Sequence, residues 1–123
     1  MSNLKRSHRC AGLIVGAAVG DALGAPFEFQ SANNYKLRFP SPVYGGIGEM
    51  IGGGTFAWLP GEFTDDTQMA LALALSLLEG GGFDPDVTWN FGRSWSYTAK
   101  DIGNTTRHSL SYENWRDVSH SNP

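Results

Sequence analysis

Residues 61–71 read GEFTDDTQMAL, a stretch in which a turn delivers a polar cluster directly into a long apolar run. Thr64, Asp65, Asp66 and Thr67 offer only hydroxyl and carboxylate oxygens, which suit Mg²⁺, Ca²⁺ or Mn²⁺ better than zinc. Two neighbouring carboxylates repel each other, so bound metal would offset the cost of packing them side by side. The residues therefore predict a site for a hard divalent cation.

The same residues have a second interpretation, as the start of a helix. Asp and Thr are favoured N-caps, and Asp65 with Gln68 three residues later is close to a capping box. Acidic side chains are also stabilised near the positive end of a helix. Taken alone, the residues favour capping over metal binding, because short motifs carry false positives.

The apolar run after this cluster alternates leucine with alanine or serine at positions 71, 73, 75 and 77, which is the period of a strand. Against a strand, the run consists of strong helix formers without β-branched residues, and three glycines at 80–82 supply a stop. We predict a helix over residues 64–79. Because this helix is apolar all round, we expect it to lie buried in a helical bundle.

The composition is that of a globular domain and excludes several classes of partner. The chain has 123 residues, 41% of them hydrophobic, which fits one domain at most. A net charge of −3 provides no polybasic surface for nucleic acid or anionic lipid. Cys10 is the only cysteine, so no internal disulfide can form, and we expect a cytoplasmic protein.

The N-terminus resembles a signal peptide only superficially. Residues 1–10 are basic and polar, and an apolar run follows over residues 11–19. That run contains glycines, meets Asp21 early and is too short to span a bilayer as a helix. We therefore expect neither a targeting segment nor a membrane partner.

Glycines at positions 12, 16, 20 and 24 fall on one face of a helix that we predict over residues 10–24. Each glycine costs a helix roughly 0.5–1 kcal/mol relative to alanine, so four of them indicate that another backbone or a ligand comes close. Close helix packing is the favoured interpretation for Gly12 and Gly16. Asp21 and Glu28 flank the Gly-Pro stop of this helix and are candidates for a site, although a lone acid there more often caps or faces solvent.

Residues 29–60 are rich in Gly, Pro and Asn and predict an irregular loop, either a functional lid or binding segment or a poorly ordered insertion. Asp84-Pro85 then predicts the capped start of a third helix over residues 85–97. The polar tail from 109 to 123 has no sustained period, so the chain is expected to stop in mid-fold.

Residues 100–107 read KDIGNTTR and place a carboxylate, a glycine turn, hydrogen-bond donors and a cation in one loop before a helical start. Such loops bind anionic ligands. The alternative, slightly favoured from these residues alone, is an ordinary helix cap by Asn104 or Thr105.

Three segments together resemble the successive N-terminal motifs of the ADP-ribosylglycohydrolase family, which includes the hydrolases of ADP-ribosylated dinitrogenase reductase. The segments are GAAVGDALGAPFE (16–28), GEFTDDTQM (61–69) and KDIGNTTR (100–107), and their order and spacing agree with the family. The resemblance implies an all-α fold, a helical bundle of this family's type, with a binuclear Mg or Mn centre that hydrolyses a glycosidic bond to ADP-ribose. The implied partner is an ADP-ribosylated protein or an ADP-ribose-containing small molecule.

The resemblance also implies roles for individual residues. Thr64, Asp65 and Asp66 match the first metal-ligand cluster of the family, and Glu28 matches an acid beside the metals at the substrate entrance. Asp101 matches a substrate-side acid that binds or protonates the scissile region. The catalytic group is thus Glu28, Asp65, Asp66 and Asp101, and the substrate-binding group is Glu28, Asp101, Gly103, Asn104 and Thr105.

One family feature is missing from the sequence. The family closes its metal site with a second Asp-x-Asp-Ser/Thr cluster far downstream, whereas the only Asp-x-Asp here is Asp84-Pro85-Asp86, which comes too early and precedes Val87. Residues 1–123 therefore resemble a single partial domain, the N-terminal part of the enzyme, and are expected to be inactive alone. A non-catalytic ADP-ribose binder remains one alternative. The other is a structural helical module, with the glycine face as an oligomer interface and the acids as helix caps. The apolar helix over residues 64–79 would lack partners on one side, so self-association through exposed core is also expected.

Overall fold

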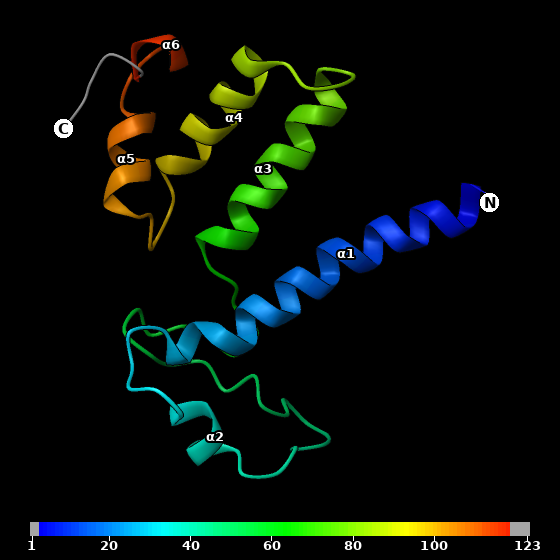
Figure 1. Ribbon diagram of the computed structural model, residues 1–123, viewed down its shortest axis with the longest axis vertical. Helices are drawn as coiled ribbons and strands as arrows, with labels where there is room; N and C mark the ends of the chain where they lie inside the picture. The colour runs from blue at the N-terminus through cyan, green and yellow to red at the C-terminus, as the bar shows by residue number, and fades with distance from the viewer. Residues whose placement is uncertain (1–2, 119–123) are drawn as a thin grey trace. The chain divides into compact units, whose positions relative to one another are not determined.

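The computed structural model describes residues 3–118, and in that range every regular element is a helix (Figure 1). The order is α1 (Asn3–Gly24), η1 (Ala25–Phe27), α2 (Asn34–Arg38), α3 (Asp65–Glu79), α4 (Pro85–Ser96), α5 (Asn104–Leu110) and α6 (Trp115–Val118). Extended pairing in the described range is limited to one isolated bridge between Gly53 and Trp58. The predicted all-α class is confirmed. The chain divides into two compact units, Met1–Thr67 and Gln68–Pro123, which we describe separately.

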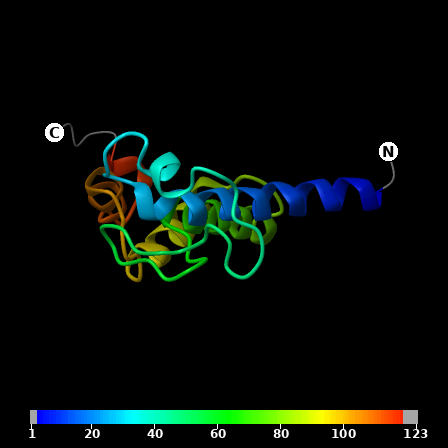
Figure 2. The same ribbon diagram turned by 90° about the horizontal axis from the view of Figure 1, so that it is seen from below.

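Helix α1 begins at Asn3, seven residues before the predicted start, because the basic N-terminal residues continue the helix. Figure 2 shows it as one uninterrupted helix. The segment Lys5–Phe27 contains an 18-residue window with a mean hydropathy of 1.6, and by length and composition it could cross a bilayer. It extends beyond residues 11–19 at both ends, so the apolar stretch is longer than the run considered from the sequence. Signal sequences and core helices of soluble proteins share this property, so it does not assign a location.

The glycine face of α1 is open. A Cβ atom added at any of the four glycines would meet nothing within 4 Å in the described chain. The close helix packing predicted for Gly12 and Gly16 is therefore not formed by the residues described here. Leu13 and Val15 on the same helix are 71% and 61% exposed.

Helix α3 confirms the helix prediction and contradicts the predicted burial. It begins one residue later than expected, and Gly82 N donates to the carbonyl of Leu77 over 3.0 Å to close its C-terminal end. Leu73 and Leu75 are nevertheless 44% and 52% exposed. Ser76 of α3 is fully buried, and its hydroxyl lies 3.0 Å from the hydroxyl of Thr88 on α4. The second unit thus covers α3 incompletely.

Helix α4 begins as predicted. The Asp84 carboxylate accepts from Asp86 N at 2.9 Å and from Val87 N at 3.1 Å, and Pro85 occupies the first turn. Because a cap and a proline act within a few residues, the sequence alone located this start.

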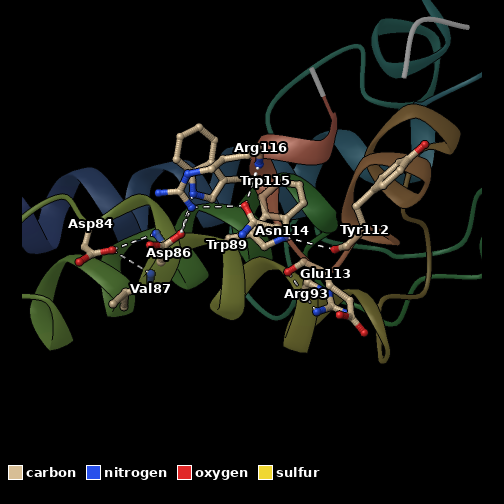
Figure 3. A network of polar contacts seen from close by, with 10 residues as sticks. All are labelled: Asp84, Asp86, Val87, Trp89, Arg93, Tyr112, Glu113, Asn114, Trp115 and Arg116. Atoms are coloured by element: carbon tan, nitrogen blue, oxygen red, sulfur yellow. Dashed lines mark hydrogen bonds and ion pairs between the residues drawn. The ribbon is translucent and has the colours of Figure 1, made fainter. Parts of the chain in front are cut away.

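The tail contains a short helix that the sequence analysis missed. Helix α6 contacts α4 and α5, and Figure 3 shows the polar network that attaches it to α4. The Trp115 indole N–H and the Arg116 guanidinium donate to the Asp86 carboxylate at 2.7 and 3.0 Å. The Arg116 guanidinium also lies over the Trp115 ring, 4.3 Å from its centroid. Four residues carry no detectable period, and residues 119–123 of the predicted polar tail lie outside the described range.

The irregular segment from 29 to 60 is largely a loop, as predicted, with α2 inside it. Phe27, Tyr35 and Phe39 form an edge-to-face aromatic cluster with ring centroids 5.1–6.2 Å apart. The Tyr35 hydroxyl donates to the Glu49 carboxylate, which also accepts from Val43 N at 3.0 Å. These contacts fold the loop back on itself, which argues against a poorly ordered insertion.

Candidate functional site

An open hollow of about 440 Å³ lies in the first unit, where α1, η1 and the first turn of α3 meet. Three of the site residues implied by the family resemblance line it, namely Glu28, Thr64 and Asp66. They come from two segments that are 36 residues apart. Asp21 and Phe27 are also among the lining residues, and Asp65 is half-buried beside the hollow without lining it.

Asp21, in the last turn of α1, holds the start of α3. Its Oδ2 atom accepts hydrogen bonds from Thr64 N at 2.9 Å, from Thr67 N at 3.2 Å and from the Thr67 hydroxyl at 2.6 Å. Thr64 and Thr67 are 4% and 3% exposed, so water has little access to these bonds. The carboxylate lies at the positive end of α3, where negative charge is stabilised.

The predicted capping box of Asp65 and Gln68 does not form. The helix begins at Asp65, so Thr64 occupies the cap position, and its hydroxyl accepts from Asp66 N at 3.3 Å. The Gln68 side chain instead accepts from the Trp95 indole N–H at 2.7 Å. Capping is real, but Thr64 and the distant Asp21 provide it, which leaves the Asp66 carboxylate at the hollow.

Glu28 follows directly after η1 and is exposed. Its local backbone is fixed from two sides. The Gln30 side chain donates to the Pro26 carbonyl at 2.7 Å, and the backbone of Gly54 packs so closely that an added Cβ would lie 2.6 Å from the same oxygen. The loop from 52 to 58 therefore supports the turn that presents Glu28.

The oxygen donors around the hollow are of the type that a hard cation prefers, but there are fewer of them than such an ion needs. Glu28 and Asp66 supply carboxylate oxygens and Thr64 supplies a hydroxyl, which are the ligand types of Mg²⁺ and Mn²⁺. Such ions take about six oxygen ligands. Within residues 3–118, no group of three or more His, Cys, Asp or Glu side chains is placed to hold a metal. The hollow thus offers part of a coordination sphere.

The second predicted loop belongs to the second unit. Asp101 is half-buried, Gly103 occupies the cap position of α5, and Asn104 and Thr105 are exposed in its first turn. The cap position is taken by Gly103, which has no side chain, so the predicted cap by Asn104 or Thr105 is wrong. Asp101 and its neighbours lie in the second unit, whereas the hollow lies in the first.

A second cavity, of about 660 Å³, lies among α3, α4, α5 and α6. No charged side chain lines it, and its walls include the rings of Trp89, Trp95 and Trp115. Thr105 of the predicted substrate loop is on its border. A cavity without charged groups does not match a diphosphate ligand, so the first hollow is the better candidate site.

Sequence reasoning noticed Asp21 but not its function. Its partner Thr67 lies 46 residues away, and no local pattern links the two. The one signal in the sequence was Thr67. This second threonine lies in the first turn of a helix that already had a cap candidate at Thr64, so its hydroxyl was available for a distant partner.

Comparison with known proteins supports the motif-based resemblance over almost the whole chain. The sequence pattern of the ADP-ribosylglycohydrolase family matches residues 2–122. The chain is 39% identical over 110 residues to ADP-ribosylarginine hydrolase Tri1 of Serratia proteamaculans, covering 83% of this chain and 27% of the relative. It is 39% identical over 103 residues to the ADP-ribosyl-[dinitrogen reductase] glycohydrolase of Rhodospirillum rubrum, covering 83% and 33%. The chain thus spans between about a quarter and a third of the length of these relatives. The chain belongs to the ADP-ribosylglycohydrolase family.

Proposed function

We propose that this chain contributes part of the active site of a hydrolase that cleaves the glycosidic bond between ADP-ribose and a protein side chain or small molecule. Two relatives support the reaction, since their names specify ADP-ribosylarginine and ADP-ribosyl-[dinitrogen reductase] as substrates. The observation that carries the proposal is the gathering of Glu28, Thr64 and Asp66 around one hollow.

Under this proposal Thr64, Asp65 and Asp66 hold Mg²⁺ or Mn²⁺, with Glu28 beside the ion. A bound divalent cation polarises substrate oxygens and lowers the pKa of water, which supplies a nucleophile at neutral pH. Asp66 and Glu28 provide negative charge at the hollow, and the buried hydroxyl of Thr64 provides a neutral oxygen. Asp65 is half-buried and lies between the lining residues Thr64 and Asp66 in the sequence.

The number of ligands limits what these residues do alone. Two cations need about twelve ligand positions, of which water fills only some. The hollow supplies the carboxylates of Glu28 and Asp66 and the hydroxyl of Thr64, while the Asp21 carboxylate holds the start of α3 through Oδ2. We propose that further carboxylates, outside this chain, complete the binuclear centre. The isolated chain is then expected to bind a cation weakly and to lack hydrolase activity.

The loop at Asp101, Gly103, Asn104 and Thr105 is the proposed contact to the ADP-ribosyl group. Exposed donors at the start of α5 suit an anionic ligand, and the half-buried Asp101 suits a role in orienting or protonating the scissile region. The proposed setting is the cytoplasm, with an ADP-ribosylated protein or a small molecule as substrate.

Calorimetry with Mn²⁺, and separately with ADP-ribose, tests this proposal on the chain itself. Wild type is expected to bind Mn²⁺, and Asp66→Asn to lose most of that binding. Asp84→Asn is the matched control, since asparagine caps a helix about as well as aspartate and Asp84 lies outside the hollow.

Equal Mn²⁺ binding by wild type and Asp66→Asn would contradict the metal assignment. Binding of ADP-ribose without any Mn²⁺ response would favour a non-catalytic binder. Absence of both, together with self-association through the exposed leucines of α3, would favour a structural module.

A further inference from the structure

The Asp21 carboxylate connects the end of α1 with the start of α3, and we propose that it is a positioning residue for the candidate metal site. It holds Thr64 and the first turn of α3 so that the Asp66 carboxylate lies at the hollow beside Glu28. The expected effect on cation affinity rests on the proposed function. The hydrogen bonds of Asp21, by contrast, are observed and do not depend on that function.

The hydrogen bonds on Asp21 converge on one atom. Oδ2 accepts from two backbone amides and one hydroxyl, over distances from 2.6 to 3.2 Å. Hydrogen bonds to an ionised acceptor are about twice as strong as neutral ones. Because Thr64 and Thr67 are buried, removal of the acceptor leaves donors without a partner at a cost of about 1–3 kcal/mol.

The same geometry argues against Asp21 as a cation ligand through Oδ2. A carboxylate oxygen has about two lone-pair sites, and three donors already occupy this one. The atom is therefore fully used in holding α3. Asp21 acts on the site through the residues that it orients.

The support around Asp21 is rigid enough for positioning. Ala22, in the last turn of α1, and Ala25, directly after it, are 3% and 5% exposed, and Trp58 of the same unit is 3% exposed. These are most of the buried apolar residues of the described chain. Buried packing of this kind fixes Asp21, and Asp21 in turn holds the proposed ligand residues within the narrow range of positions that a cation requires.

Asp84 offers a matched control because it is also a capping aspartate. Its Oδ1 atom accepts from Asp86 N and Val87 N, two residues of the helix that it begins. Asp21 caps a helix that begins more than 40 residues later in the sequence. Loss of either carboxylate removes a cap, but only loss of Asp21 releases the start of α3 from α1.

The experiment compares Asp21→Ala, Asp21→Asn and Asp84→Ala in the same chain. Mn²⁺ affinity is measured by calorimetry, and the amide proton shifts of Thr64 and Thr67 are measured by NMR without metal. Loss of a group that orients metal ligands weakens affinity by about 10–100-fold, which is the expectation for Asp21→Ala. We expect Asp21→Asn to recover part of the affinity, and Asp84→Ala to leave it within about twofold of wild type.

A second pair of variants keeps the test decisive if Asp21→Ala does not fold. Thr67→Val removes the hydroxyl that donates to Asp21, and Thr67→Ser retains it. The valine variant is expected to bind Mn²⁺ more weakly than the serine variant. Thr67 itself is not among the residues that line the hollow, so a difference between the two reports positioning.

Each outcome decides the inference. Unchanged Mn²⁺ affinity in Asp21→Ala, or an equal loss in Asp84→Ala, overturns it. If wild type binds no Mn²⁺, the proposed metal centre fails in this chain, and the amide shifts decide the role of Asp21 alone. Loss of the hydrogen-bonded shifts of Thr64 and Thr67 in Asp21→Ala, with their retention in Asp84→Ala, then supports it, and unchanged shifts overturn it.

Discussion

Replacement of Gly54 by alanine tests whether the loop from 52 to 58 supports the turn that presents Glu28. Gly54 has φ of +71°, and a Cβ atom there would lie 2.6 Å from the carbonyl oxygen and 2.8 Å from the Cα atom of Pro26. Both contacts are to backbone, so no side chain can move aside. A left-handed backbone costs a non-glycine residue about 1–2 kcal/mol, and overpacking adds about 1–3 kcal/mol.

Gly53→Ala is the matched control. Gly53 has φ of +96°, and a Cβ atom there would meet nothing within 4 Å, so this variant carries the backbone cost without the steric one. We expect Gly53→Ala to lower the free energy of unfolding by about 1–2 kcal/mol and Gly54→Ala by about 2–5 kcal/mol. The difference between the two is the steric contribution.

Urea unfolding followed by tryptophan fluorescence measures both losses, since the buried Trp58 pairs with Gly53 in the same unit. Mn²⁺ affinity is a second measurement, in which only Gly54→Ala is expected to weaken binding through displacement of the Pro26 turn. If Gly54→Ala proves no more destabilising than Gly53→Ala, the close packing of this loop on Pro26 is refuted.

Two further predictions concern carboxylates. The double substitution Asp65→Asn with Asp66→Asn is expected to abolish the rise in melting temperature that Mn²⁺ produces, because each change removes an anionic donor; an equal rise in parent and variant would contradict the ligand assignment. Hydrogen bonds from Trp115 and Arg116 hold the pKa of Asp86 below its ordinary value. This contribution to stability is present above the ordinary pKa of about 3.9 and is lost as pH falls through the lower folded value. The free energy of unfolding of wild type and of Asp86→Asn, measured between about pH 5 and pH 2, gives this contribution. A difference between the two proteins that stays constant across this range would show that protonation of Asp86 does not weaken its hydrogen bonds to Trp115 and Arg116.

Local signals were sufficient to predict much of the fold. The start of α4 follows from Asp84 and Pro85, and the end of α3 follows from the glycines at 80–82, since caps and stops act within one helical turn. Helix propensity correctly outweighed the two-residue alternation of leucines in α3. The start of α1 was missed because residues 3–9 are basic and polar and carry no apolar period.

The rest depends on contacts between distant residues. The carboxylate of Asp21 reaches Thr67 across 46 residues, and helix α6 is held by side chains of Trp115 and Arg116 on Asp86. No local pattern encodes either pairing. Burial of α3 was wrongly predicted for a related reason, because an apolar sequence shows what a helix can bury, whereas the neighbours present in the chain decide what it does bury.

The sequence indicated several residues of the candidate site but not the contacts that hold them in place. Glu28, Thr64 and Asp66 were selected from motifs and line one hollow, but the capping arrangement expected there was wrong in its residues. Asp101 was selected in the same way and lies in the second unit. A motif identifies which atoms are chemically useful, and the fold determines which of them share a site.

The measurement that tests the central claim most directly is release of free ADP-ribose from ADP-ribosylarginine in the presence of Mn²⁺. The chain is assayed alone and after mixing with a polypeptide that corresponds to the remaining part of a family relative, with Asp65→Asn as the control. We predict no release by the chain alone, release after mixing, and none when the mixed chain carries Asp65→Asn. Turnover by the chain alone, with Asp65→Asn inactive, would contradict the account, because a half-set of ligands would then be enough for catalysis.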